Sequence, residues 1–574
     1  MKTASPNIFR LLAATICGLF SSWGDADAAP SLRYPLPLND YVVVQSSRLS
    51  AREKKAIALL VEEVEKRTQI RWLTTESWPA AARGAIWVGR ATDAAAQGAI
   101  AGRNMPADPG DTLAEGYRVS TASEGASPAI QVMGNDERGV LFGVGRLLRE
   151  LDMERGQIIL PAPLNVATAP KYPLRGHQIS YRPKSNTYDG WTVAMREQYI
   201  RDLAVFGTNA VELIPPDSDD LPFSPHFSLP AMEMMVETSR LLDEYGLDVW
   251  LWYPPTREDH DPRPAAPSTE EWAEVFARLP RLDAVFVPGA NGKPMPPKLL
   301  FAFVEKLAPV LKRYHPRAEL WVSPQAFPQE WMDDFYALLQ AEPKWLSGVV
   351  FGPAIRVSLP ELRRLVPPRY GVRFYPDITH SGPGQYPVAD WDTAYGLTHG
   401  RESINPRPVD QAAIFRLLQP SAERGFITYS EGCNDDVNKI IWSSLGWDPA
   451  AEPVDILREY GRYFIGGAHA DVFAQGLLAL ERNWRGPLLA NAGVETTLAQ
   501  FQVLERAATP RMLANWRFQQ ALYRAYYDAY VRARLLYETA AEAEAMAALR
   551  QVDRVGSLAA MDARLKLSGE FDAN

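Results

Sequence analysis

Four carboxylates stand at or near short apolar runs, and their placement suits acid–base chemistry. Glu431 and Asp377 each follow such a run closely. Glu402 lies in the long segment between these two runs, whereas Glu212 lies inside another apolar run. Cleavage of a glycosidic bond requires two carboxyl groups facing that bond, one protonated and one ionised. Burial among apolar residues would raise the pKa of Glu212, as a general acid requires.

Each of these carboxylates also has a structural explanation, because a carboxylate at the end of a strand can pair with an arginine and hold a loop. Arg401, next to Glu402, is such a partner for the long segment. A loop of that length between two elements is usually functional. The residues alone leave open which two carboxylates form a catalytic pair.

Ten further polar or aromatic residues fall at expected strand ends or in the loops after them. Planar polar groups and flat amphipathic rings are the side chains that contact sugars. The alternative is that they satisfy loop backbone, and Asp435 can pair with Lys439 one helical turn later. The expected substrate-binding residues are His177, Tyr181, Trp252, Tyr253, Gln325, Trp391, Arg401, Asn405, Asp435 and Asn438.

Eight short, nearly continuous apolar runs alternate with helical patterns between residues 171 and 447, which predicts buried parallel strands. Eight such units have about the length of a (β/α)8 barrel, about 250 residues, whose active sites lie at the carboxyl ends of the strands. A doubly wound open sheet is the alternative, but no glycine-rich phosphate loop follows the first run. The expected strands are Leu174–Ser180, Ala210–Ile214, Asp248–Trp252, Ala284–Val287, Glu319–Ser323, Gly348–Phe351, Val372–Tyr375 and Phe426–Tyr429.

The segments on either side of this barrel predict two further domains, so the expected fold class is α/β. Residues 29–170 show strand and helix patterns of a small α/β domain, and residues 448–574 read as helical. Residues 1–28 have a basic start, a short apolar stretch and an Ala-Asp-Ala cleavage site, which predicts a signal peptide. We therefore expect a bacterial periplasmic or secreted protein.

Composition excludes several classes of function. The net charge is −9 with no long basic run, which argues against nucleic acid and, once the signal is removed, against a membrane surface. The two cysteines are Cys17, inside the signal, and Cys433, so the mature chain has no internal disulfide. Only seven histidines occur and none form an H-x-x-x-H pair, so we expect no metal and no cofactor.

One motif connects the first two domains to known enzymes. The segment from Asp136 to Leu147 reads D-x-R-G-x-x-x-G-x-x-x-L, and Arg175-Gly176 stands in the first barrel strand. In both features the chain resembles glycoside hydrolases of the family 20 β-N-acetylhexosaminidase and α-glucuronidase group. The resemblance implies a hexosaminidase-like α/β domain followed by a catalytic barrel that acts on an oligo- or polysaccharide.

The fourth strand departs from that family pattern. Family 20 enzymes place an Asp-Glu pair at its end, but here the segment 287–293 contains no carboxylate. The family mechanism therefore does not transfer residue by residue. Three functions stay open: a hydrolase of N-acetylhexosaminides or uronides, a non-catalytic glycan-binding barrel, and a lyase that acts on uronates with a tyrosine or histidine base.

Overall fold

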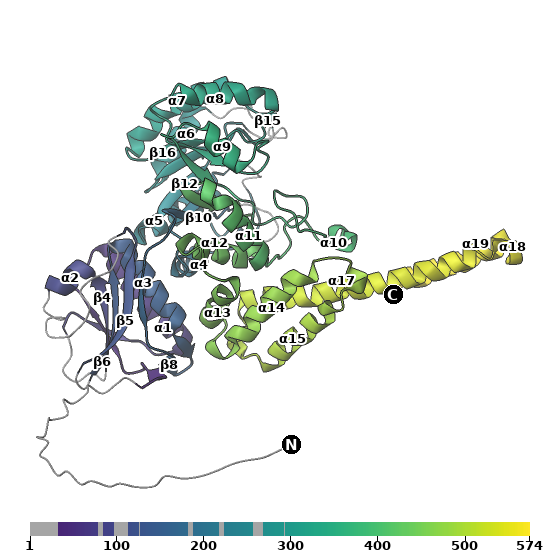
Figure 1. The fold of residues 1–574 in the computed structure, drawn as a ribbon, viewed down its shortest axis with the longest axis horizontal. Helices are drawn as coiled ribbons and strands as arrows, with labels where there is room; N and C mark the ends of the chain where they lie inside the picture. The colour runs from purple at the N-terminus through teal and green to yellow at the C-terminus, as the bar shows by residue number, and fades with distance from the viewer. Residues whose placement is uncertain are drawn as a thin grey trace, which may run out of the picture.

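The computed structural model is a mixed α/β molecule built around a closed barrel of eight parallel strands (Figure 1). It describes residues 33–77, 84–96, 113–124, 127–181, 187–216, 223–256, 268–291 and 293–573. The expected signal peptide, residues 1–28, lies outside the described residues. Among the helices of the described part, none is long and apolar enough to cross a bilayer.

All eight predicted barrel strands are present and pair in sequence order. The eighth pairs with the first, with His177 opposite Thr428, and this closes the barrel. The strands are β10 (Leu174–Gln178), β11 (Ala210–Leu213), β12 (Asp248–Trp252), β13 (Ala284–Val287), β16 (Glu319–Val322), β17 (Gly348–Phe351), β18 (Gly371–Phe374) and β19 (Gly425–Thr428).

Helices surround this barrel, as the alternating pattern predicts. They are α4 (Val193–Val205), α5 (Ala231–Glu244), α6 (Thr269–Arg278), α7 (Pro297–Tyr314), α8 (Met332–Gln340), α9 (Leu359–Leu365), α11 (Pro408–Leu418) and α12 (Asp436–Trp447). A short helix, α10 (Thr393–Thr398), lies in the segment between β18 and β19. Before α12, a 3-10 turn at Cys433–Asp435 connects the helix to the end of β19.

The N-terminal part contains a six-stranded sheet of order β3-β2-β4-β6-β5-β9, packed against two long helices. Its strands are β3 (Leu73–Thr75), β2 (Val42–Gln45), β4 (Ala85–Arg90), β6 (Ser127–Gly134), β5 (Tyr117–Glu124) and β9 (Asn165–Thr168). The helices are α1 (Ala51–Thr68) and α3 (Glu137–Glu150). A three-stranded sheet of β1 (Leu36–Pro37), β8 (Gln157–Leu160) and β7 (Asp152–Glu154) completes this part.

The motif that carries the family resemblance joins this part to the barrel. Asp136 caps α3 by accepting a hydrogen bond from the backbone N–H of Gly139 at 2.7 Å. Arg138 then binds both Glu115, at 2.8 Å, and Asp248 of β12. Arg175 of β10 binds the other oxygen of Glu115 at 2.6 Å. The two arginines therefore fix the first sheet to the barrel, so these motif residues hold the architecture together.

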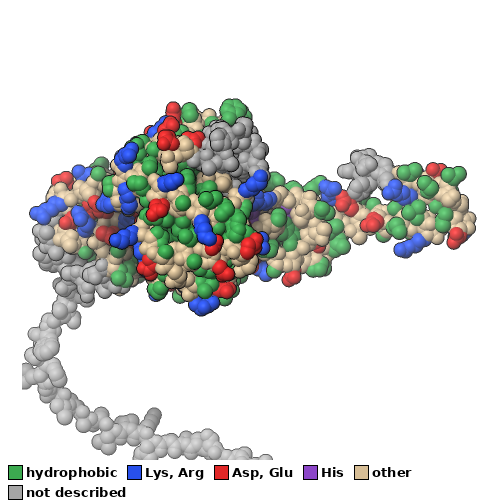
Figure 2. Space-filling view, turned by 90° about the horizontal axis from the view of Figure 1, so that it is seen from above, with side chains coloured by type: hydrophobic (Ala, Val, Ile, Leu, Met, Phe, Trp, Pro, Cys, Tyr) green, Lys and Arg blue, Asp and Glu red, His purple; other side chains and the backbone are tan. Residues whose placement is uncertain are grey.

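Beyond the barrel the chain is helical, as predicted. The longer helices are α13 (Pro453–Phe464), α14 (Ala470–Asn483), α15 (Gly493–Ala507), α17 (Trp516–Leu549) and α19 (Ser557–Ala573). The end of α17 projects away from the rest of the molecule together with α19 (Figure 1). Figure 2 shows lysines and arginines interspersed with acidic side chains over the described atoms of one face. The division into domains at residues 170 and 447 stays a prediction.

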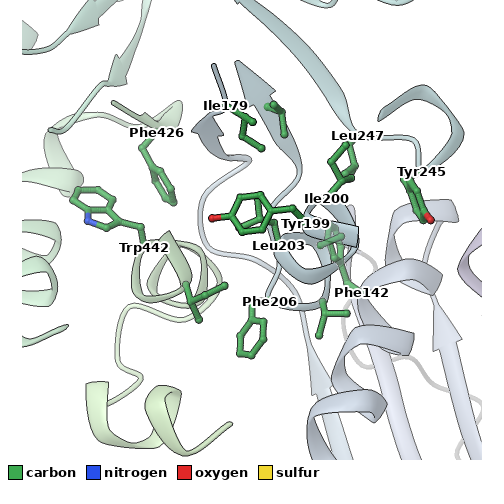
Figure 3. Close-up of a cluster of buried hydrophobic side chains, with 14 of the residues drawn as sticks. Phe142, Ile179, Tyr199, Ile200, Leu203, Phe206, Tyr245, Leu247, Phe426 and Trp442 are labelled. Atoms are coloured by element: carbon green, nitrogen blue, oxygen red, sulfur yellow. The ribbon is translucent and has the colours of Figure 1, made fainter. Parts of the chain in front are cut away.

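One apolar core runs between the parts. Figure 3 shows Phe142 of α3, Tyr199 and Leu203 of α4, and Trp442 of α12 within it. A separate apolar cluster fills the barrel interior, with Trp250 among its members. The barrel mouth is thus built on a densely packed frame.

Candidate active site

A cavity of about 270 Å³ opens where the sequence places the chemistry, at the carboxyl ends of the barrel strands. Four residues predicted for catalysis or binding line it: Trp252, Gln325, Asp377 and Arg401. Five other polar or aromatic residues of its wall are Gln178, Tyr375, His380, Gln385 and Tyr429. Its volume is near the lower end for ligand pockets, which suits a single sugar ring.

Asp377 organises the turn that follows β18. One carboxylate oxygen accepts the backbone N–H groups of Thr379 and His380, at 3.1 and 3.2 Å. The other accepts the backbone N–H of Gln385 at 3.2 Å and lies 2.8 Å from the Nδ1 atom of His380. Because the carboxylate is held by three backbone groups, it fixes the imidazole orientation, as in other carboxylate–histidine pairs.

His380 is the titratable group at the cavity wall with the most distinctive environment. Burial by itself lowers the pKa of His380, but the hydrogen bond to Asp377 and the nearby carboxylate of Glu402 outweigh it and raise the value to about 9. Its Nε2 atom lies 3.8 Å from a carboxylate oxygen of Glu402. His380 is therefore an imidazolium at neutral pH, whose Nδ1–H donates to Asp377 and whose Nε2–H lies on the side of Glu402.

Glu431 is fully buried at the end of β19. It is not among the described residues that line the cavity, whereas Tyr429 is. The hydroxyl of Tyr429 donates a hydrogen bond to the Glu431 carboxylate. The carboxylate that the sequence favours most thus sits behind a tyrosine that faces the cavity.

Glu402, in the segment between β18 and β19, lies near both His380 and Glu431. Among the described residues, one nitrogen of His380 and one oxygen each of Glu402 and Glu431 lie within 4.8 Å of one another, close enough to hold a metal ion. An imidazole with two carboxylates is a donor set that suits zinc or ferrous iron. Hydrogen bonds from His380 to Asp377 and from Tyr429 to Glu431 also account for this arrangement without an ion.

Glu212 lies inside the barrel, below the cavity. Its carboxylate forms a 2.6 Å ion pair with Arg373, and both side chains are fully buried. Burial raises the pKa of Glu212, while Arg373 opposes the rise. Gln178 lies between Glu212 and the cavity, donating to Glu212 at 3.3 Å and to the hydroxyl of Tyr375 at 2.9 Å. The structure therefore separates Glu212 from the other three candidate carboxylates.

Three of the aromatic residues predicted to bind sugar pack elsewhere. Tyr181 stacks on Phe227 with ring centroids 4.2 Å apart. Tyr253 stacks on Trp272 of α6 at 3.6 Å. Such stacking removes ring surface from water, which stabilises the packed arrangement. Trp391 stacks on Trp484 in the C-terminal helices at 5.4 Å.

His177 also points away from the cavity. It lies between the barrel wall and α12, where its ring nitrogens contact the hydroxyls of Thr428 at 2.9 Å and Ser443 at 2.7 Å. Burial, and after it the charge of Lys439, lower the pKa of His177 well below its ordinary value. It is a neutral packing residue whose polar atoms are satisfied.

The three remaining predicted binding residues hold the site loops in place. Asn438 accepts the backbone N–H of Arg407 at 2.9 Å and donates to the carbonyl of Asn405 at 3.0 Å. Asn405 donates to the carbonyl of Thr379 at 2.6 Å. Asp435 forms the expected ion pair with Lys439. These side chains satisfy buried loop backbone, the alternative that the sequence left open.

Sequence reasoning considers His380, with His177, only as a base for the lyase alternative, and it does not include Tyr429 among the site residues. The signal for His380 was the Asp-x-x-His spacing directly after a strand, which lets the carboxylate reach both the backbone and the imidazole of the same turn. Tyr429 stands two residues before Glu431, so both side chains leave the same face of an extended segment. The alternation of side chains along this extended segment was therefore the sequence signal for Tyr429.

Comparison with known proteins bears on the fold. No protein-family model and no curated protein sequence matches the chain. A GH115 4-O-methyl-α-glucuronidase with specificity for decorated arabinogalactans superposes with a TM-score of 0.58 at 11% identity, covering 93% of this chain and 76% of its own. CpGH84B gives 0.53 at 13% identity, covering 94% and 96%. A GH138 enzyme targeting pectin rhamnogalacturonan II gives 0.54 at 10%, covering 92% and 72%.

The chain shares the fold of these glycoside hydrolases. The resemblance inferred from the motif of residues 136–147 is confirmed at that level. At identities of 10–13%, the likeness concerns architecture. The reaction therefore depends on the residues of this chain's own cavity.

Proposed function

We propose that this protein hydrolyses O-glycosidic bonds, with His380 as the proton donor. One observation carries the proposal: an imidazolium, oriented by Asp377, forms part of the wall of a sugar-sized cavity at the carboxyl end of a (β/α)8 barrel. The fold shared with glycoside hydrolases supports it.

With His380 as the proton donor, the reaction needs no carboxylate at the end of strand four, where this chain has none. A glycosidase needs an acid that gives a proton to the leaving oxygen. His380, after strand seven, holds a proton at neutral pH and can release it from Nε2 while Asp377 stabilises the ring. The acid has therefore moved to another strand and changed residue type.

The other groups of the site can stabilise positive charge in the transition state or contact the sugar. Glu402 and Glu431 lie close to His380 and can stabilise the cationic transition state of glycoside cleavage. Trp252 and Tyr375 provide rings for the apolar face of a sugar. Arg401 lines the cavity and suits a substrate carboxylate. We therefore favour a uronide as substrate over an N-acetylhexosaminide, and an exported protein that meets glycans outside the cytoplasm.

The test is a panel of chromogenic aryl uronides and N-acetylhexosaminides, of both anomeric forms, with the protein lacking residues 1–28. We expect turnover of at least one uronide. His380→Gln and Glu431→Gln should lose that activity, while Glu305→Gln, which changes an exposed glutamate of α7, should keep it. Tight binding of sugars without any turnover would instead identify a glycan-binding protein.

A uronate lyase is a second candidate, because Tyr429, His380 and Arg401 line one cavity. A lyase uses a tyrosine or histidine to remove the proton next to a carboxylate that a cation neutralises. Its product carries a carbon–carbon double bond that absorbs ultraviolet light. Both reactions release a reducing end, so a reducing end without that absorbance supports the hydrolase, and a reducing end with that absorbance supports the lyase.

A further inference from the structure

Tyr429, and not Glu431, is among the described residues that line the cavity and could attack a sugar. Glu431 is fully buried, and its carboxylate accepts the hydroxyl of Tyr429, which lines the cavity. A sugar in the cavity would therefore meet the tyrosine before the carboxylate. We propose that Tyr429 is the nucleophile of a retaining hydrolysis and that Glu431 is its base. This inference rests on the proposed hydrolase function.

The backbone of Tyr429 is held between two strand ends. Its N–H donates to the carbonyl of Pro376 at 2.8 Å, and its carbonyl accepts the N–H of Ile378 at 3.3 Å. It also forms a parallel bridge with Asp377, the residue that orients His380. The nucleophile and the residue that orients the acid are therefore held together by backbone contacts, as efficient attack requires.

The ring of Tyr429 is fixed as well. The ring centroid of His380 lies 5.4 Å away, and that of Tyr375 lies 5.5 Å away in an edge-to-face arrangement. These two neighbours leave the hydroxyl directed to Glu431. Tyr429 thus has the two requirements of an activated nucleophile: a base within hydrogen-bond reach and a fixed orientation.

Charge favours a phenol over a carboxylate at this position. Asp377, Glu402 and Glu431 already place three carboxyl groups around His380. A sugar that carries its own carboxylate would be repelled by a fourth anion at the attacking atom. A phenol is neutral until its proton leaves, so it can approach such a sugar. Tyrosine nucleophiles are known among glycosidases.

In the first step, the oxygen of Tyr429 bonds to the anomeric carbon and its proton passes to the Glu431 carboxylate. The bond from that carbon to the leaving oxygen breaks, the electron pair goes to that oxygen, and His380 supplies its proton. In the second step, water attacks the anomeric carbon and gives its proton to His380. The bond to Tyr429 breaks, and the tyrosine oxygen recovers the proton from Glu431. Two displacements retain the anomeric configuration.

The first experiment compares Tyr429 with Tyr314, an exposed tyrosine that is not among the described residues lining the cavity, on the aryl glycoside that the wild type cleaves. Tyr429→Phe should lower kcat by at least about a thousandfold, the scale expected when a directly reacting group is lost. Tyr314→Phe should leave kcat unchanged, because this ring is exposed on α7. Normal kcat in a folded Tyr429→Phe protein would overturn the inference while leaving the hydrolase function intact.

The second experiment uses the wild type, so it does not depend on a variant folding. An aryl 2-deoxy-2-fluoro derivative of the same sugar should leave one fluoroglycosyl group on the peptide that contains Tyr429. Proton NMR should show a first product of retained configuration. A label on Glu431, Glu402 or Asp377, or an inverted product, would refute the tyrosine. A wild type that cleaves no glycoside would remove both the proposed function and this inference.

Discussion

Two buried carboxylates of the barrel each bind one cationic side chain, and the two pairs differ in partner and in place. Glu212 binds Arg373 inside the barrel at 2.6 Å, with both side chains fully buried. Asp377 binds His380 at 2.8 Å on the wall of the cavity. Both carboxylates follow from the same kind of sequence pattern, an acidic residue in or after an apolar run.

The difference lies in what the cation can do. A guanidinium keeps its proton throughout the accessible pH range, so the pair of Glu212 and Arg373 can only hold charge. An imidazolium can release its proton and take it back, so the pair of Asp377 and His380 can take part in a reaction. Of these two acidic residues, only Asp377 has a partner that can titrate and that lines a cavity.

The largest expected effect comes from removing the partner that titrates. His380→Gln should lower kcat by about 100- to 10,000-fold, the range for loss of a general acid. His399→Gln is the matched control, because His399 contacts Arg524 in the C-terminal helices and should leave kcat unchanged. Steady-state kinetics on the cleaved glycoside measures both, and equal rates for the two variants would contradict the role of His380.

Breaking the inner pair should instead cost stability. Glu212→Gln leaves the Arg373 charge buried without its counter-ion, which should lower the free energy of unfolding by about 3–5 kcal/mol. Changing Arg373→Met in the same protein should recover most of that loss, since an apolar side chain replaces the uncompensated charge. Denaturant unfolding measures both. The activity of the folded fraction should stay near normal, and a selective loss of kcat would assign Glu212 to the chemistry.

The barrel was predictable because its strands are buried on both faces and therefore read as short apolar runs. Trp250 and Val285 are examples, and each lies in a run that the structure confirms as a strand. The helical C-terminal part was predictable for another reason, because it is rich in Ala, Leu, Glu and Arg and several of its tyrosines recur at helical spacing. The start of the last barrel helix marks the limit. Asn434 followed by Asp435 and Asp436 is typical of a helix start, but Cys433–Asp435 forms a 3-10 turn and α12 begins at Asp436.

The site was only partly predictable, because a sequence shows that a residue is near a strand end but not which way it faces. Asp377, Trp252, Gln325 and Arg401 reach the cavity. His177, at an equally suitable position, faces α12 instead. The partner of a buried charge also cannot be identified from the sequence, because Glu212 and Arg373 are 161 residues apart. Those contacts arise only once the barrel closes.

A smaller effect is expected from changing the carboxylate of the outer pair. Asp377→Asn keeps the size of the side chain but offers an amide to the Nδ1 atom of His380, which weakens the imidazolium and its orientation. We expect kcat to fall by about a hundredfold, less than for His380→Gln, because the imidazole itself stays. The pH–rate profile should also lose activity at a lower pH than in the wild type. An unchanged profile would mean that Asp377 only supports the turn.

The smallest expected effect, and the one that separates the two pairs most directly, is on how stability varies with pH. The pKa of His380 is raised from its ordinary 6.5 to about 9 in the folded protein. Below pH 6.5 the imidazole is charged in both the folded and unfolded states, so the stabilisation is fully present. As pH rises towards about 9, the unfolded chain releases the proton while the folded protein keeps it, so the stabilisation declines and is lost above the folded pKa.

The Tm difference between wild type and His380→Gln should therefore shrink from pH 6 to pH 10, by on the order of a few degrees. The Tm difference between wild type and Glu212→Gln should change much less over the same range, because Arg373 does not titrate there. Parallel curves for the two variants would show that His380 does not hold its proton as the geometry implies.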